Sequence, residues 1–186
     1  MGINWDEVVD TPEPSSEDFV PLPDGARVLA KVETVTGKRN ANGRPYASVV
    51  SKVVSIQAGL PEGNYGHPKL WDNFNFTLPE DPAAFAGQPE DVVAKKRKAL
   101  EIFKARTKAL GLTLTRDTDL GTPEAIGAFF AGAIGTEVII KTRLEAATLN
   151  EDGSVKYRAK STPNAYDPVT PARIQKYGFV NESVSF

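Results

Sequence analysis

The sequence predicts a mainly β fold with helices, built on five antiparallel strands. Five segments have the alternating or β-branched pattern of strands, and a stretch with a helical period of about 3.6 residues separates the third from the fourth. Three strands, then helices, then two strands is the element order of the OB-fold, a small Greek-key barrel. We therefore expect an OB-fold-like five-stranded antiparallel barrel with a helical insertion between strands 3 and 4. An α+β sandwich is the alternative that this order leaves open.

The chain has 186 residues, of which 40% are hydrophobic and 25% charged, so it has room for one domain plus tails. We expect an acidic flexible arm over residues 1–24 and an OB-like domain over 25–160, with its helical insertion at about 82–134. Residues 161–186 form a C-terminal segment interrupted by prolines.

The first expected strand, residues 27–35, alternates between two faces, with Val28, Ala30, Val32 and Thr34 on the inward side. Residues 38–44 contain an Asn-Gly pair and no large apolar side chain, which predicts a cationic hairpin loop. In the second strand, residues 46–56, apolar side chains fall on both faces, as a bulge or cover on both sides would explain.

The third expected strand, residues 70–77, is the most informative segment. Alternation turns Leu70, Phe74 and Phe76 inward, with Asp72 as the polar exception, and it turns Trp71, Asn73, Asn75 and Thr77 outward. An exposed indole beside amides suits a flat partner with polar edges, such as a nucleobase. The alternative is that Trp71 packs against a neighbouring loop.

Two helices are expected in the insertion. Residues 89–110 carry an apolar stripe of Val92, Val93, Ala99, Leu100, Phe103 and Leu110. The outer face of this helix carries Lys95, Lys96, Arg97, Lys98, Lys104, Arg106 and Lys108, which are either solvated or an auxiliary nucleic-acid contact. Thr122 and Pro123 have the residue types of a helix start, and the second helix then runs to residue 134.

The last two expected strands form a hairpin with a cationic outer side. Residues 136–144 place Lys141 and Arg143 outward, and after a turn at 150–153 the outward residues are Lys156, Arg158 and Lys160. Val155, Tyr157 and Ala159 would face inward. A short helix is expected over 171–177, ended by Gly178.

The charge is segregated along the chain. Residues 1–24 contain no Lys or Arg and seven acidic residues, namely Asp6, Glu7, Asp10, Glu13, Glu17, Asp18 and Asp24. The remainder carries 22 basic against 17 acidic residues, a charge of +5. A basic body with an acidic arm is expected of a polyanion binder whose arm competes for its own cationic surface, and a solubilising tail is the alternative.

The sequence offers little for catalysis. Because cysteine is absent and His67 is the single histidine, disulfides, thiolate metal sites and most Ser-His chemistry are excluded. Asp117 and Asp119 have the character of turn and capping residues. We expect no enzymatic activity, no cofactor and no metal. The chain shows neither a leader nor a long apolar run, so a cytoplasmic protein without membrane contact is expected.

Several short motifs occur in a familiar order: Phe-Val-Pro-Leu-Pro-Asp-Gly at 19–25, Gly-Arg-Pro-Tyr at 43–46, the segment 70–76, and Ala-Leu-Gly at 109–111. Over residues 19–160 the chain resembles a family of small bacteriophage single-stranded DNA-binding proteins found beside phage replication and recombination genes. The resemblance implies an OB-like core, binding without sequence preference, no catalysis, and a place among phage or host replication and recombination proteins. Unlike many single-strand binders, this chain has almost no acidic residues at its C-terminus, which ends at Phe186.

Together these observations predict a sequence-nonspecific single-stranded DNA-binding protein. The expected contacts are Arg27, Lys31, Lys38, Arg39, Arg44, Tyr46, Trp71, Asn73, Lys141, Arg143, Lys156, Arg158 and Lys160. The alternative is a phage protein-protein interaction or structural module that binds no nucleic acid.

Overall fold

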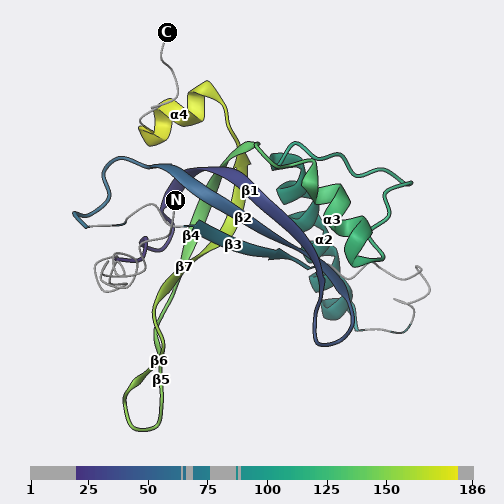
Figure 1. The fold of residues 1–186 in the computed structure, drawn as a ribbon, viewed down its shortest axis with the longest axis horizontal. Helices are drawn as coiled ribbons and strands as arrows, with labels where there is room; N and C mark the ends of the chain where they lie inside the picture. Colours follow the sequence, from purple (N-terminus) through teal and green to yellow (C-terminus); the bar gives the residue numbers. More distant parts are fainter. Residues whose placement is uncertain (1–19, 64, 66–68, 76–86, 88, 180–186) are drawn as a thin grey trace, which may run out of the picture.

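The computed structural model describes residues 20–63, 65, 69–75, 87 and 89–179. Its main element is a five-stranded antiparallel sheet in the order β3-β2-β1-β4-β7. These strands are β1 (Arg27–Arg39), β2 (Pro45–Ile56), β3 (Lys69–Phe74), β4 (Glu137–Glu145) and β7 (Lys160–Pro168). A small ribbon of β5 (Thr148–Leu149) and β6 (Val155–Tyr157) projects away from the body between β4 and β7 (Figure 1).

Two helices fill the interval between the third and fourth strands, as expected. These are α2 (Glu90–Ala109) and α3 (Pro123–Ala131), which lie together on one side of the sheet (Figure 1). The Thr122 hydroxyl accepts a hydrogen bond from the Ala125 N–H at 3.1 Å, which confirms the predicted helix start. None of the helices in the described part of the chain is both long and apolar enough to cross a membrane.

The main core lies between the inner face of the sheet and these two helices. The Phe74 ring lies 4.7 Å from the Phe130 ring and 6.5 Å from the Phe103 ring, measured between centroids. The aromatic side chains therefore join β3, α2 and α3 into one packed cluster, within the centroid range where ring pairs attract.

Helix α3 approaches β1 closely enough to exclude a side chain. A Cβ on Gly37 would overlap the backbone carbonyl of Pro123, and a Cβ on Gly127 would lie 3.0 Å from the Gly37 nitrogen. Glycine on both elements lets the two backbones pack almost in contact.

A β-bulge changes the facing of β1 halfway along its length. Its pairing with β2 shifts register between Val32 and Thr34, so the extra residue, Glu33, reverses the alternation beyond it. Val28, Ala30 and Val32 are buried as predicted, but Thr34 is exposed. The prediction that Thr34 faces inward is therefore wrong. A second register shift, between Leu29 and Ala30, places a bulge in β2, which was one of the two explanations for apolar side chains on both faces of that strand.

The fifth sheet strand lies later in the chain than predicted. Residues 155–157 belong to the projecting ribbon, and the strand that pairs with β4 is Lys160–Pro168. Prolines obscured it, because they normally argue against a strand. β7 is an edge strand, and Pro163 sits at the register shift between Lys141 and Thr142, where its missing N–H costs no ladder bond.

The two edges of the sheet, β3 and β7, approach each other without a hydrogen-bonded ladder among the described residues. Arg106 of α2 bridges them, donating to the Asp72 carboxylate at 3.1 Å and to the Asn164 carbonyl at 2.6 Å. The Phe74 and Tyr166 rings meet at 5.6 Å between centroids.

The prediction of a five-stranded antiparallel sheet is confirmed, and no closed barrel is found among the described strands. Arg106 was expected on the exposed face of the helix and instead lies in this contact.

The short helix expected near the C-terminus is present as α4 (Pro171–Tyr177), and Gly178 ends it in the left-handed conformation at φ 62°. It covers part of the outer face of the sheet. A second cluster of buried residues, Leu29, Ile139 and Phe179, packs there with Ile174 and Tyr177.

Residues 20–24 of the expected acidic arm pack against the body. Leu22 is buried in the main core, and its carbonyl accepts a hydrogen bond from the Ser161 hydroxyl at 3.1 Å. The Asp24 carboxylate accepts from the Leu144 N–H at 3.2 Å. The other six acidic residues of the arm, like Phe76 and Thr77 of the third strand and His67, lie outside the described residues.

Candidate nucleic-acid interface

The half of the outer sheet face that α4 leaves uncovered is formed by β1, β2 and β3, and we call it the open face. Strand pairing arranges its outward side chains in rows across the strands. In order along the sheet, these rows are Lys38–Tyr46, Thr36–Ser48–Asn73, Thr34–Val50–Trp71 and Lys31–Lys52–Lys69.

Trp71 stands near the middle of the open face with 61% of its surface exposed. Its neighbours Leu70 and Phe74 are buried in the core. The alternation predicted for β3 is therefore confirmed over its described part, and the alternative of a Trp packed under a loop is wrong. An indole in this position presents a ring to solvent among the hydroxyl and amide groups of Ser48, Thr34 and Asn73.

Cationic side chains lie at both ends of the open face. At one end the Lys31, Lys52 and Lys69 row crosses all three strands. The Lys69 ammonium is 2.9 Å from the Glu33 carboxylate, and Lys31 is opposite Glu137 in the ladder with β4. Neither Lys52 nor Lys31 makes an ion pair with any carboxylate that the structure describes.

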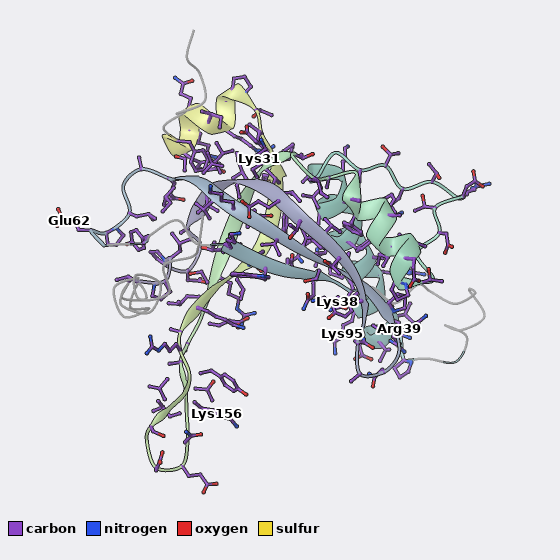
Figure 2. The ribbon with its side chains drawn as sticks, in the orientation of Figure 1. Lys31, Lys38, Arg39, Glu62, Lys95 and Lys156 are labelled. Carbon is purple, nitrogen blue, oxygen red and sulfur yellow. The ribbon has the colours of Figure 1, made fainter. Side chains whose placement is uncertain are left out.

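At the other end lies the β1–β2 loop, with Lys38, Arg39 and Arg44 exposed. In Figure 2, Lys38 and Arg39 are at the tip of this hairpin and Lys31 is at the far end of the sheet. Asn40 holds the loop in shape, because its side-chain oxygen accepts from the Asn42 and Arg44 N–H groups at 3.0 Å. The Arg39 guanidinium donates to the Gly43 carbonyl at 2.9 Å.

Four more of the predicted cations lie on the projecting hairpin and on the adjoining ends of β4 and β7. Arg143, Lys156, Arg158 and Lys160 are all exposed, with Lys160 3.4 Å from the Glu145 carboxylate. Lys156 lies on the part that projects beyond the body, well apart from Lys38 and Arg39 (Figure 2). Tyr157 was predicted to face inward but is 66% exposed, because the hairpin leaves the body and neither of its sides has a core to pack on. The Lys156 ammonium is 5.7 Å from the Tyr157 ring centroid.

Two predicted contact residues do not belong to the open face. The Arg27 guanidinium lies 4.6 Å from the centroid of the Tyr177 ring, beneath α4, and its Nε is buried. Lys141 is opposite Arg27 in the ladder and is half-buried. Both belong to the covered half of the outer face, because α4 packs on the strands that carry them.

Sequence reasoning missed Lys52 and Lys69, which complete the cationic row. Lys52 is two residues beyond Val50, which faces outward beside Trp71. The signal was hidden because apolar residues occur on both faces of β2, so its outward side could not be identified until its partner strands were known.

A cluster of Asp72, Arg106 and Tyr166 lies directly behind the open face. Asp72 faces the core between Trp71 and Asn73, where it contacts Arg106 and Tyr166. Burial raises the pKa of Asp72 above its usual value, and the Arg106 charge and a hydrogen bond from Tyr166 only partly offset this. Burial, with the Asp72 charge second, raises the pKa of the Tyr166 hydroxyl well above 10.0. Tyr166 thus remains a neutral donor, and the cluster holds β3 against α2 and β7.

Within the described residues, no group of three or more His, Asp or Glu side chains is placed to hold a metal ion. Asp119 accepts a hydrogen bond from the Gly121 N–H at 2.8 Å, the turn role expected for it. No family model matches the chain, and no curated protein matches it either.

Proposed function

We propose that this protein binds single-stranded DNA without sequence preference, using the open face. The observation that carries the proposal is the exposed Trp71, set among polar side chains and flanked at both ends by cations. Stacking of a base on an exposed aromatic ring stabilises binding by about 1–3 kcal/mol and accepts any base.

The arrangement supports a division of roles. Lys31, Lys52 and Lys69 at one end, and Lys38, Arg39 and Arg44 at the other, neutralise phosphates. Trp71 and Tyr46 contact bases, and they stand about 13 Å apart along the strands, since four residues separate the Tyr46 row from the Trp71 row. Asn73 and Ser48 lie between them and offer hydrogen bonds to base edges.

The strand order supports an OB-like architecture for this surface. In OB-folds, the face of strands 2 and 3 and the loops joining strands 1–2 and 4–5 bind oligonucleotides. Here the open face includes β2 and β3, the first loop carries Lys38, Arg39 and Arg44, and the β5–β6 hairpin joins the fourth and fifth sheet strands. The seam between β3 and β7 is bridged by Arg106 in place of a ladder.

The resemblance of the short motifs to phage single-strand binders favours a role in phage DNA replication or recombination. Such a role requires coating exposed single strands, which matches a site built from stacking and charge.

A fluorescence titration tests the proposal, because Trp71 reports directly on contact. Single-stranded dT should quench the tryptophan emission and duplex of equal length should bind more weakly, while rU measures the preference for DNA over RNA. If about four to six phosphates are neutralised, log K should fall against log salt with a slope of roughly −3 to −4. Tighter binding to duplex, or a slope near zero, contradicts the proposal.

One observation favours the second candidate, a protein-interaction module. The projecting hairpin exposes Leu149, Val155 and Tyr157, each more than half exposed. Under this alternative the hairpin binds an apolar protein surface, and the same titration shows neither quenching nor salt-dependent affinity for any oligonucleotide.

A further inference from the structure

A carboxylate lies on the open face, and it belongs to the bulge of β1. The strands β1, β2 and β3, which the structure describes in full, contain two acidic residues, Glu33 and Asp72. Asp72 faces the core, where it contacts Arg106, so Glu33 is the one acidic residue that these three strands direct outward. Its negative charge stands on a surface that we propose to bind a polyanion.

Glu33 reaches across β2 to a lysine of β3. It is the extra residue of the bulge, between buried Val32 and exposed Thr34. Its carboxylate is 2.9 Å from the Lys69 ammonium, although β2 lies between their two strands and neighbouring strands are about 4.8 Å apart. The two side chains are 31% and 52% exposed, respectively, so the ion pair crosses the open face in contact with solvent.

This ion pair adds little to the stability of the fold. Water screens an exposed pair, and two long side chains must be ordered to form it. The three strands are held instead by their ladders and by the main core, which lies on the opposite face of the sheet. The position of Glu33 therefore matters more for what binds the open face than for folding.

A carboxylate and a phosphate use the same donors of a lysine. Both are anions whose oxygens accept hydrogen bonds from an ammonium group. Lys69 is the β3 member of the cationic row, which also contains Lys31 and Lys52. A phosphate that approaches Lys69 thus meets an ammonium that already has an anion beside it, the Glu33 carboxylate.

We propose that Glu33 is an internal competitor for the DNA phosphate at Lys69. The inference rests on the proposed function, and it names a residue that limits the affinity of the same site. Binding exchanges one anion for another: the phosphate takes the Lys69 ammonium, and the Glu33 carboxylate turns to solvent. Because the ion pair stabilises the free state, a bound strand is released more readily than it would be without Glu33.

The substitutions Glu33→Gln and Asp167→Asn form a matched pair that tests the competition. Each replaces a carboxylate by an amide of similar size and breaks one ion pair, since the Asp167 carboxylate is 3.1 Å from the Arg173 guanidinium. That second pair joins β7 to α4 on the covered half of the outer face. Any difference between the two variants therefore reports the position of the carboxylate and not the net charge.

Affinity is measured for a labelled dT oligomer of about 16 nucleotides, the upper limit of the site size for one OB-fold. Glu33→Gln should raise the affinity about two- to fivefold at 0.1 M salt, the range of one exposed ion pair. The slope of log K against log salt should steepen by up to about 0.7, the value for one phosphate, so the gain shrinks as salt is added. Asp167→Asn should change the affinity much less. Thermal unfolding of both variants checks that the fold is retained.

Lys69→Ala, alone and combined with Glu33→Gln, tests whether Glu33 acts through Lys69. The loss of affinity from Lys69→Ala should be larger in the Glu33→Gln protein, because there Glu33 no longer competes for the ammonium. Equal losses in the two backgrounds would overturn the inference while leaving the proposed function intact.

Two further outcomes would also overturn the inference alone. Equal gains from Glu33→Gln and Asp167→Asn would mean that only the net charge matters. A fall in affinity on Glu33→Gln would mean that the carboxylate positions Lys69 for the phosphate and does not compete with it. If the unsubstituted protein binds no dT at any salt concentration, the proposed function itself fails, and the inference fails with it.

Discussion

The outer face of the sheet has two halves that share strand β1 but present opposite chemistry. Beneath α4, the outward residues Leu29 and Ile139 are as buried as any core side chain. On the open face, the outward residues in the Trp71 and Asn73 rows are mostly hydroxyls, amides and an exposed indole. Helix α4 covers the apolar half of the outer face and leaves the mainly polar half exposed.

The difference shows how a single aromatic residue should be interpreted. An apolar side chain on the covered half has apolar neighbours from α4, so its burial is explained by folding alone. Among the described residues no helix packs on Trp71, and its exposed ring is the reason we propose a contact with another molecule there. Five substitutions, described in order of decreasing expected effect, test this difference.

The largest effects are expected for fully buried side chains on either face of the sheet. Ile139→Ala should lower the free energy of unfolding by about 2–5 kcal/mol, because it leaves a cavity between β4 and α4. Phe74→Ala, on the core side of β3, should cost about 3–5 kcal/mol for the same reason. Urea denaturation measures both losses. Under conditions where the Ile139→Ala protein remains folded, its affinity for dT should be unchanged, and a large loss of affinity would show that the two halves are coupled.

Trp71→Ala should give the opposite pattern on the open face. Affinity for single strands should fall by about 1–3 kcal/mol as the stacking platform is removed. The free energy of unfolding should change by less than about 0.5 kcal/mol, as is usual for exposed positions. Isothermal titration and urea denaturation of one protein batch give both numbers. An unfolded Trp71→Ala protein would contradict the assignment of the open face.

Lys52→Ala should reduce the salt dependence of binding by about 0.7 in the slope of log K against log salt, the value for one phosphate on a single strand. Lys176→Ala is the matched control, since Lys176 is an exposed lysine on α4, with its ammonium 5.5 Å from the Tyr177 ring centroid. The control should leave the slope unchanged. Equal slopes for the two variants would mean that the cations act only through the total charge.

The smallest effect concerns the carboxylate behind the open face. Because the pKa of Asp72 is raised in the folded state above 3.8, folding takes up a proton between the two pKa values, and stability from this group falls as pH rises through the raised pKa. Asp72→Asn should remove that part of the pH dependence. Unfolding free energies of both proteins across the acidic range test it, and identical profiles would exclude a raised pKa.

Regular, unbulged segments could be predicted from the sequence. β3 has a clean alternation, and Leu70, Trp71 and Phe74 face as expected. The orientation of residues beyond a bulge could not be predicted. The extra residue Glu33 reverses the inward and outward positions of the residues that follow it, and the local sequence contains no signal for this bulge. β7 was not predicted because Pro163 argued against a strand. Proline is excluded from central strands but is tolerated in an edge strand such as β7.

The candidate site was predicted in part, for a related reason. The identity of Trp71 and of the loop cations follows from residues near each other in the chain. The removal of Arg27 from the site depends on α4, about 150 residues away, and the addition of Lys52 depends on the register between β2 and β3. The positions of Arg27 and Lys52 are both determined by contacts between segments that are distant in the sequence, and such contacts cannot be predicted from a local sequence pattern.

The close approach of Gly37 to Pro123 and Gly127 has a consequence for surveys of mutational tolerance. Gly37 lies on β1 immediately before Lys38, beside the cationic loop, so a scan scored by DNA binding would find it as intolerant as any contact residue. Its intolerance would have another origin, since any Cβ there displaces α3 and with it the packing of the core. Residues of this kind mark the boundary between the binding surface and its scaffold, and only a survey scored in parallel for abundance would separate the two.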